Sequence, residues 1–192
     1  MGESLSTDVE CIAHAKTGDS QAFRQLVERY EGQVAATVVG MLGAGAEAED
    51  VGQEVFIRFY ESLDKFRGDS AVGTYLTRIA INLSLNAVER RKRMRWRLWS
   101  RDESEGPPEY VGADGREERL RQEWSESLHA ALQQLDPAFR AVVVLRMLEG
   151  YSTKETADLL DVAEGTVLSR LSRAMKKLEK ILKKEGDLSH ER

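Results

Sequence analysis

The sequence is poor in cysteine, proline and aromatic residues, and each shortage excludes a class of protein. A single cysteine, Cys11, among 192 residues excludes an internal disulfide framework and fits a reducing compartment, so we expect a cytoplasmic protein. Only 3 prolines and 7% aromatic residues favour helices over sheets. No apolar run approaches the roughly 18 residues of a membrane-spanning helix, and the acidic start lacks the apolar core of a secretory signal. We therefore predict an all-α protein that does not insert into a membrane.

Metal ligands, catalytic groups and phosphate-binding loops are also scarce. Cys11 and His14 have the spacing of half a metal site, but His129 and His190 supply no second pair, and a zinc site needs about four ligands. The sequence contains no glycine-rich phosphate loop and no grouping typical of a catalytic triad. We therefore expect no metal, no cofactor, no catalytic residue and no enzymatic activity.

The net charge of −5 hides a strongly uneven distribution. The chain carries −7 over residues 1–66, +7 over residues 67–101, −9 over residues 102–165 and +4 over residues 166–192. Basic segments of this kind can bind phosphates, whereas acidic segments oppose indiscriminate DNA binding and suit a basic protein surface. The distribution predicts nucleic-acid contacts in two separate parts of the chain.

Helical periodicity dominates the chain on both sides of one interruption. Apolar residues recur at intervals of three and four along residues 22–30 and 51–63, with a glycine-rich break between these segments. Residues 100–118 instead combine two adjacent prolines, three glycines and mixed charge, which indicates a flexible linker. We therefore predict two small helical domains, at residues 1–97 and 120–192, joined by a flexible linker at residues 98–119.

The segment after the linker has the pattern of a helix-turn-helix. Asp136 and Pro137 supply the N-cap and first-turn proline of one helix. Ser152 and Glu155 form a capping box for a short helix, which a turn joins to a long helix beginning near residue 164. Four apolar residues of the helix after Asp136 are expected to face inward: Phe139, Val142, Val143 and Met147.

The exposed face of the long helix is rich in hydroxyl and basic side chains, which suits entry into the major groove of DNA. The residues on this face are Thr166, Ser169, Arg170, Ser172, Arg173, Lys176 and Lys177. A solvated basic helix in a plain helical bundle is the alternative interpretation of the same spacing.

A second candidate surface lies on a helix of the first domain, where Tyr75, Arg78, Asn82 and Asn86 share one face. The opposite face carries the apolar residues Leu76, Ile79, Ala80 and Leu83. An aromatic ring, a guanidinium and two carboxamides can stack on an unpaired base and hydrogen-bond its edge. The basic run that follows can hold phosphates, and consists of Arg90, Arg91, Lys92 and Arg93. The alternative is a polar surface stripe with a basic cluster that suits a helix C-terminus.

Two segments resemble the extracytoplasmic-function (ECF) sigma factors of bacteria. Residues 48–93, which read AEDVGQEVFIRFYESLDKFRGDSAVGTYLTRIAINLSLNAVERRKR, resemble region two of that family. Residues 135–178, which read LDPAFRAVVVLRMLEGYSTKETADLLDVAEGTVLSRLSRAMKKL, resemble region four. The order of the segments and the linker between them also match. The resemblance implies a transcription initiation factor that binds core RNA polymerase and directs it to a two-part promoter.

The resemblance also implies a role for each surface. Asn82 and Asn86 would capture a flipped non-template base of the minus-ten element, and Ser169, Ser172 and Arg173 would read the minus-thirty-five element as duplex. The helix over residues 136–149 would meet the flap of the second-largest polymerase subunit. Members of the family are commonly held inactive by an anti-sigma factor, and we expect one here. The candidate contacts with the clamp coiled coil of the largest subunit are Asp50, Gln53, Glu54 and Arg58, with Phe56 expected in the core.

Several positions depart from the family pattern. Tyr75 stands where the family often has Trp, Asp161 and Ala163 stand where it often has Gly and Pro, and Leu168 stands where it often has a basic residue. The promoter sequence therefore cannot be transferred from a relative. The alternative function is a stand-alone helix-turn-helix regulator that binds duplex DNA as a dimer, which would leave Asn82 and Asn86 without a role.

Overall fold

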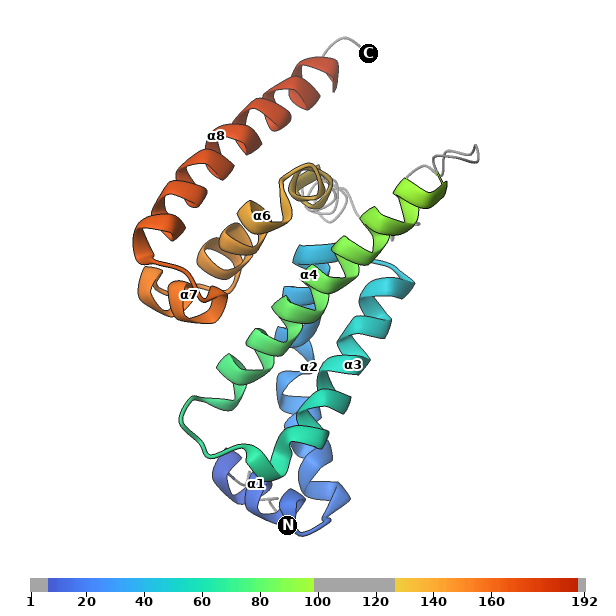
Figure 1. Ribbon diagram of the computed structural model, residues 1–192, viewed down its shortest axis with the longest axis vertical. Helices are drawn as coiled ribbons and strands as arrows, with labels where there is room; N and C mark the ends of the chain where they lie inside the picture. Colours follow the sequence, from blue (N-terminus) through green and yellow to red (C-terminus); the bar gives the residue numbers. More distant parts are fainter. Residues whose placement is uncertain (1–6, 99–126, 190–192) are drawn as a thin grey trace.

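The computed structural model describes residues 7–98 and 127–189, and these ranges contain helices and no strands (Figure 1). The predicted all-α fold is confirmed there, whereas the predicted linker at residues 98–119 falls almost wholly outside the described residues. What we call the N-terminal bundle consists of α1 (Asp8–Lys16), α2 (Ser20–Leu42), α3 (Ala46–Ser62), the 3₁₀ turn η1 (Leu63–Lys65) and α4 (Val72–Leu98). What we call the C-terminal unit consists of helical residues 127–133, α6 (Pro137–Val143), the π-helical segment η2 (Val144–Leu148), α7 (Thr153–Leu160) and α8 (Glu164–Ser189).

Polar caps and glycines set the helix boundaries in the N-terminal bundle. Thr7 and Glu10 form a capping box at the start of α1, and the Asp19 carboxylate accepts the amide hydrogens of the first turn of α2. The break between α2 and α3 depends on Gly43 and Gly45, whose φ angles of 79° and 139° favour a residue without a Cβ atom. The predicted glycine break is therefore confirmed.

The core of the bundle lies among α2, α3 and α4. Its centre is formed by fully buried side chains from all three helices, including Leu26, Val34, Val55, Phe59 and Leu76. The predicted apolar face of α4 is confirmed, because Leu76 and Ala80 are buried and Ile79 and Leu83 pack partly buried against the same core. Phe56 also packs against this core, as the sequence predicts.

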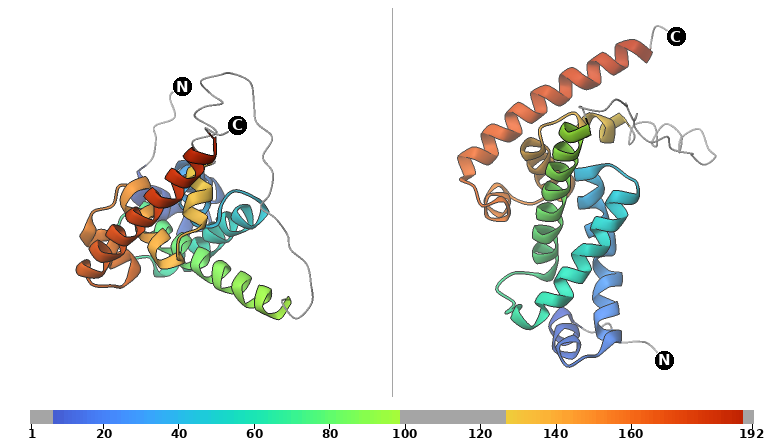
Figure 2. Two further views of the ribbon diagram at one scale, coloured as in Figure 1. Left: turned by 90° about the horizontal axis from the view of Figure 1, so that it is seen from above. Right: turned by 45° about the vertical axis from the view of Figure 1, so that its right-hand side comes forward.

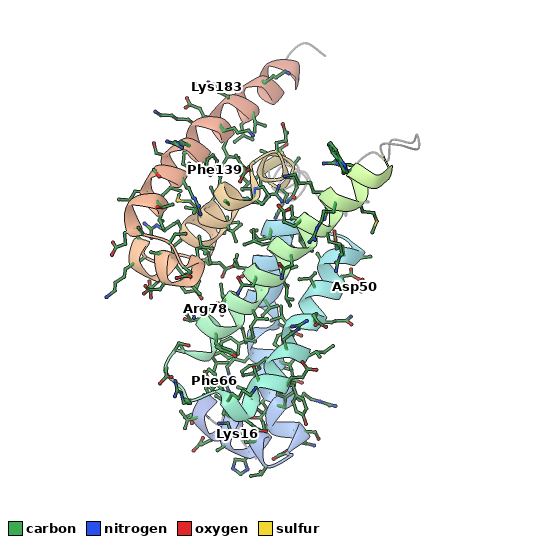
Figure 3. All side chains as sticks on the ribbon, viewed as in Figure 1. Lys16, Asp50, Phe66, Arg78, Phe139 and Lys183 are labelled. Carbon is green, nitrogen blue, oxygen red and sulfur yellow. The ribbon has the colours of Figure 1, made fainter. Side chains whose placement is uncertain are left out.

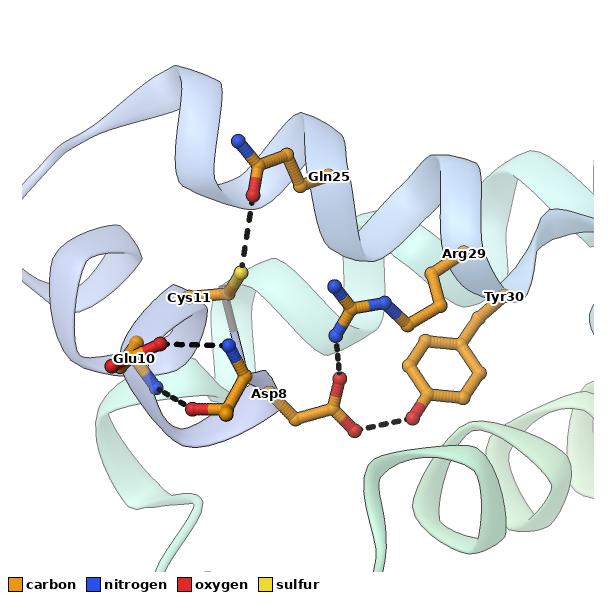
Figure 4. A network of polar contacts seen from close by, with 7 residues as sticks. Asp8, Glu10, Cys11, Gln25, Arg29 and Tyr30 are labelled. Carbon is orange, nitrogen blue, oxygen red and sulfur yellow. Dashed lines mark hydrogen bonds and ion pairs between the residues drawn. The ribbon is translucent and has the colours of Figure 1, made fainter. Parts of the chain in front are cut away.

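Helix α1 is fixed to α2 by polar contacts around one carboxylate (Figure 4). Asp8 accepts hydrogen bonds from the guanidinium of Arg29 and the hydroxyl of Tyr30. Burial and the bond to Asp8 raise the pKa of Tyr30 to about 12, so this phenol keeps its proton throughout the neutral range. The thiol of Cys11 is buried beside α2 and lies 3.5 Å from the Gln25 side-chain oxygen. Cys11 therefore has a packing role in this helix pair.

A π-helical turn changes the register at the end of the helix after Asp136. The Glu149 amide donates to the Val144 carbonyl over five residues, at 2.9 Å, where an α-helix would use four. The wider turn rotates the following side chains, so Met147 is 56% exposed instead of facing inward. The prediction for Met147 is wrong for this reason, whereas Val142 and Val143 are buried as expected.

The two parts of the protein share one apolar core. Ala141, Val144, Leu145 and Leu159 of the C-terminal unit belong to the same buried cluster as the core of the N-terminal bundle. Figures 1 and 2 show the C-terminal unit along the side of the bundle formed by α2 and α4, with α3 on the far side. Figure 3 shows Asp50 and Arg78 on these opposite sides. The N-terminal bundle and the C-terminal unit therefore lie in direct contact.

Candidate nucleic-acid interface

Helix α4 presents the two asparagines that the sequence singled out. Asn82 and Asn86 are both exposed and lie one turn apart, because residues four apart share a helix face. The opposite side of the same turns is buried, with Ala80 and Ile81 inaccessible to solvent. A carboxamide offers both hydrogen-bond donors and an acceptor, so this pair can bond the edge of an unpaired base.

Arg78 continues the same face towards the start of α4, where it meets the C-terminal unit. Its Nη2 donates to the Asp158 carbonyl oxygen of α7 at 3.1 Å. A polar cleft of about 720 Å³ opens between these two parts of the protein. The cleft is lined by Asp69, Ser70, Thr74 and Arg78 on one side and mainly by α7 and the turn after it on the other. Arg78 is thus already engaged by protein in this arrangement.

Tyr75 lies apart from the three polar residues of this face. Its ring is half-buried and packs at 5.1 Å from Phe66 and 6.0 Å from Phe59, measured between ring centroids. Its hydroxyl donates to the Ser62 Oγ at 3.1 Å. The ring is occupied by core contacts, so base stacking by Tyr75 stays a prediction that would need movement of the aromatic cluster.

The basic run after Asn86 is exposed but partly paired within the protein. Arg91 forms an ion pair with Glu47 at the start of α3, and Arg90 lies 3.7 Å from the same carboxylate. Arg93 is exposed and its Nε lies 3.4 Å from the Glu89 carbonyl oxygen. Exposed pairs of this kind contribute little stability, roughly 0–1 kcal/mol, so a phosphate can compete for these guanidinium groups.

The helix-turn-helix is formed by α7 and α8. Ser152 and Glu155 make the predicted capping box, with the Glu155 amide 3.2 Å from the Ser152 Oγ and the Ser152 amide 2.8 Å from the Glu155 carboxylate. These bonds also lower the pKa of Glu155. Asp161 then adopts the left-handed conformation, φ 52°, at the end of α7. Aspartate tolerates this conformation better than most residues, which explains how the turn forms without glycine.

A small apolar core holds α7 against α8. Val142, Ala157 and Val167 are buried together, and Leu160, Val162 and Leu171 pack around them. Ala157 allows the two helices to approach, as expected from its small side chain. The orientation of α8 is therefore fixed by its apolar side.

The opposite side of α8 carries most of the predicted base-reading residues. Ser169, Ser172, Arg173, Lys176 and Lys177 are exposed, whereas Thr166 and Arg170 are half-buried. Ser169 donates its hydroxyl to the Thr166 carbonyl at 3.0 Å, which leaves the Ser169 oxygen free to accept a hydrogen bond from a base. Leu168 is 56% exposed beside them and adds an apolar group to the same region of the helix.

The outer face of α3 holds the residues predicted to contact RNA polymerase. Asp50, Gln53 and Arg58 are exposed, and Glu54 is half-buried. Arg58 Nε donates to the Glu54 carboxylate at 2.7 Å, one helical turn away. The prediction did not include Ile57 and Tyr60, which are more than half exposed on the same helix. Apolar groups among exposed charges are typical of a protein-binding surface.

Arg140 is a structural residue that the sequence alone did not reveal. Its guanidinium is only 5% exposed and bonds the carbonyl oxygens of Leu132, Gln133 and Leu135, the Gln133 side chain, and the Met41 carbonyl at the end of α2. Burial lowers the pKa of Arg140 to about 10, so the group stays charged at neutral pH. It bonds carbonyls at helix ends in both parts of the protein, where backbone donors are scarce.

Within the described residues, no three His, Cys, Asp or Glu side chains come together in a way that could hold a metal ion. None of the described helices has the length and apolar character needed to cross a membrane. The described residues present exposed polar faces on α4 and α8, and a further one on α3. A two-part helical protein with a helix-turn-helix and a separate asparagine-bearing helix has the architecture of a transcription factor.

Comparison with known proteins identifies the family. Residues 26–94 match the family Sigma-70 region 2, and residues 125–178 match Sigma-70, region 4. The chain is 34% identical over 183 residues to the RNA polymerase sigma-H factor of Pseudomonas aeruginosa, covering 91% of this chain and 93% of that protein. It is also 34% identical over 187 residues to the ECF RNA polymerase sigma-E factor of Escherichia coli, covering 93% and 95%. The chain therefore belongs to the ECF sigma factors, a family of transcription initiation factors.

Solved structures agree with this assignment. The structure of CnrH in complex with the cytosolic domain of CnrY aligns with a TM-score of 0.65 at 26% sequence identity, covering 92% of this chain and 97% of that one. The sigma factor RpoE of Bartonella quintana, solved with the anti-sigma factor NepR, has the same fold, with a TM-score of 0.65 at 22% identity over 84% of this chain and 96% of that chain. Membership of the family favours a sigma factor over a stand-alone dimeric regulator.

Proposed function

We propose that this sigma factor reads a two-part promoter with its two helical domains, residues 1–97 and 120–192, while core RNA polymerase is bound to the first. The observation that supports the proposal best is the pair of exposed carboxamides, Asn82 and Asn86, on a helix whose other side is buried. Two exposed asparagines in register, followed directly by exposed arginines, suit an extruded base and its backbone.

The minus-ten element is read as a single strand in this proposal. Extrusion of a base costs a few kcal/mol, which contacts made only with the flipped base must offset. Asn82 and Asn86 bond the edge of that base, and Arg78 approaches it from the preceding turn. Arg90, Arg91 and Arg93 hold phosphates on the C-terminal side, and Glu47 releases Arg90 and Arg91 when DNA binds.

The minus-thirty-five element is read as duplex by α8. Ser169, Ser172 and Arg173 lie where the first turns of a recognition helix reach base edges, and Lys176 and Lys177 lie further along for phosphate contacts. Thr166 and Arg170 contribute from the edge of the same face. Leu168 can contact a thymine methyl group, where a basic residue would contact phosphate.

Core polymerase binds the outer face of α3. Asp50, Gln53, Glu54 and Arg58 supply polar contacts there, and the exposed Ile57 and Tyr60 supply apolar area to the same surface. Because α3 lies on the far side of the bundle from α7, this surface is accessible while the two parts of the protein are in contact (Figure 1).

An anti-sigma factor controls the protein in this proposal. The support comes from the similar proteins, since CnrH was solved with the cytosolic domain of CnrY and RpoE with the anti-sigma factor NepR. Such a partner would act in the cytoplasm, where the polymerase is.

Substitution of Asn82 tests the minus-ten role directly. In the holoenzyme, Asn82→Ala is expected to abolish permanganate reactivity of unpaired thymines at the promoter without weakening the binding of this subunit to core polymerase. Glu89→Gln is the matched control, because Glu89 is exposed on the same helix and has no assigned contact with DNA. Normal promoter melting by the Asn82→Ala variant would show that Asn82 does not contact the flipped base.

A further inference from the structure

We propose that Trp96, near the end of α4, is a further DNA contact, and that it holds the duplex on the upstream side of the minus-ten element. The proposal rests on the proposed function, because it assumes that Asn82 and Asn86 of the same helix capture an unpaired base. It adds a contact with paired DNA to a helix whose asparagines contact a single strand.

Trp96 is unusually accessible for a tryptophan. Its exposed fraction is 84%, the highest of any large apolar side chain in the part of the chain that the structure describes. Figure 1 and the left view of Figure 2 show the last turns of α4 extending beyond the body of the N-terminal bundle. At this exposure the ring contributes little to packing, so its apolar surface and its N–H donor are available to a partner.

The register of α4 places Trp96 on the same face as the two asparagines. Residues at positions 82, 86, 89, 93 and 96 follow one another at intervals of four and three, the spacing of neighbours along one helix face, and all five are exposed. At a rise of about 1.5 Å per residue, Trp96 lies about 15 Å beyond Asn86 and about 21 Å beyond Asn82 along the helix axis. The indole therefore continues the face that holds the asparagines.

The charge around Trp96 favours a nucleic acid as its partner. Six of the eight residues at positions 90–97 are Arg or Lys, and Glu89 is the only acidic residue in the sequence of α4. Because Glu89 lies between Asn86 and Arg93 on the same face, phosphates are expected further along, at Arg93 and Trp96. An exposed aromatic ring among basic side chains suits a nucleic acid, whose phosphates pair with the arginines while its sugars and bases offer apolar surface.

The distance from the asparagines decides which part of the promoter Trp96 meets. The chain continues from the end of α4 towards the C-terminal unit, which reads the upstream element, so we place the end of α4 upstream of the flipped base. A step of about 15–21 Å corresponds to about four to six base pairs at about 3.4 Å per base pair. Melting occurs at the minus-ten element in the proposed function, so the DNA at that distance upstream is still paired.

An indole suits the backbone of such a duplex. The ring of Trp96 can lie against a deoxyribose, and its Nε1–H can donate to a phosphate oxygen. Contacts of this kind carry no sequence information, but they fix the position of the protein on the DNA. Trp96 would therefore hold the upstream edge of the melted region in register with Asn82 and Asn86.

Two DNA probes separate this contact from the contacts of the asparagines. Both come from a genomic template on which the wild-type protein directs initiation, and both carry the non-template strand of the minus-ten element. The first probe is that single strand alone. The second probe, which we call the fork probe, adds one turn of duplex, about ten base pairs, on its upstream side. Binding of each probe to the holoenzyme is measured by titration.

The Trp96 variants should affect only the fork probe. Trp96→Ala is expected to weaken its binding about tenfold, a loss on the scale of one hydrogen bond together with the contact of an aromatic ring. Binding of the single strand should not change. Trp96→Phe should lose less than Trp96→Ala, because phenylalanine keeps a ring and lacks the N–H donor. Asn82→Ala should weaken both probes, because it removes a contact with the unpaired base.

Met94→Ala is the matched control. Met94 is 57% exposed and lies two residues before Trp96, which places it about 200° away around the helix axis. Its replacement removes an apolar side chain from the same turn, on the opposite side, and should leave the binding of both probes unchanged. Because both residues are exposed, neither substitution should lower the melting temperature of the free chain.

Neutral methylphosphonates locate the contact on the DNA. One such group is placed in turn at each phosphate in the duplex part of the fork probe. At one position, about four to six base pairs from the flipped base, it is expected to weaken binding by the wild-type protein and to have no effect on Trp96→Phe, which has already lost the donor. Positions contacted by arginines should weaken both proteins equally.

The proposal is overturned if Trp96→Ala leaves the fork probe unchanged, if it weakens the single strand equally, or if Met94→Ala has the same effect. It is also overturned if Trp96→Ala weakens the binding of this subunit to core polymerase or lowers the melting temperature of the free chain, because either result would mean that protein covers the ring. Failure of the proposed function has a different signature, because Asn82→Ala would then bind the single strand as well as the wild-type protein does.

Discussion

Replacement of Arg140 by methionine tests the role of the buried guanidinium. Methionine has a similar length and no polar hydrogen, so it fills the space and removes every hydrogen bond of the guanidinium. Four backbone carbonyls lose that donor, at Met41, Leu132, Gln133 and Leu135. These carbonyls lie at or just after the ends of two helical segments, where backbone partners are scarce, and among them Leu132 also accepts from the Leu135 amide at 3.0 Å.

The expected loss of stability follows from those contacts. A hydrogen bond to a charged group contributes about 1.5–3 kcal/mol, but the bonds of one side chain are not additive, and water can reach part of the site after the change. Each buried carbonyl left without a donor costs about 1–3 kcal/mol, so with partial access of water the four together are expected to cost about 3–5 kcal/mol. That loss is a large part of the 5–15 kcal/mol of net stability typical of a folded protein, and about 10 °C in melting temperature at this chain length.

Chemical denaturation of the full chain measures this loss. Arg140→Lys should give an intermediate result, because it keeps the charge but bonds fewer carbonyls. Arg67→Met is the matched control: the side chain of Arg67 is 82% exposed and its pair with Asp69 is on the surface, so its removal should change little. A loss below about 1 kcal/mol for Arg140→Met would refute the reasoning, because it would mean that these carbonyls find other partners.

Three further predictions concern the helix-turn-helix and the contact between the N-terminal bundle and the C-terminal unit. Arg173→Ala should reduce the binding free energy for the specific duplex by about 1–3 kcal/mol in a binding titration. An equal loss of affinity for every DNA sequence would mean that Arg173 contacts a phosphate and not a base. Ser152→Ala should destabilise the protein by about 1 kcal/mol in thermal unfolding, because alanine cannot cap the start of α7. Ser152→Thr should stay close to wild type, because threonine keeps the capping hydroxyl. Burial against the N-terminal bundle raises the pKa of Glu149 above its ordinary value, so protonation of this carboxyl favours the contact between the two parts of the protein. This contact should strengthen as the pH falls through the raised pKa towards 4.5, and weaken above it. Glu149→Gln should remove this dependence of the radius of gyration on pH, and a radius that still varied with pH in that variant would refute the assignment.

Local signals in the sequence predicted the helices and much of their orientation. The capping residues Asp136, Ser152 and Glu155 marked helix starts because they satisfy amide hydrogens within a few residues of themselves. The face that holds Asn82 and Asn86 followed from the helical repeat alone. These predictions depend on neighbours along the chain, which a single sequence displays.

Contacts between distant segments were not predictable in the same way. Periodicity predicted that Val142 and Val143 face inward, but not that the next residue, Val144, packs into the core of the N-terminal bundle or that Gly40 lies opposite it. Arg140 resembles any basic residue in sequence, since the carbonyls that it bonds are 5 to 99 residues away. Met147 was misplaced because no residue type marks a π-helical turn. Tyr75 lies at the edge of an aromatic cluster that folding assembles from three segments.

Mapping of RNA 5′ ends from transcription in vitro tests the central claim most directly. Core RNA polymerase is supplied with genomic templates, with and without this protein, and with the Asn82→Ala and Arg173→Ala variants. Discrete start sites are expected only with the wild-type protein, at a fixed distance from a two-part sequence, and each variant should lose them. RNA that starts at the same positions without the protein, or no defined start with it, would contradict the account.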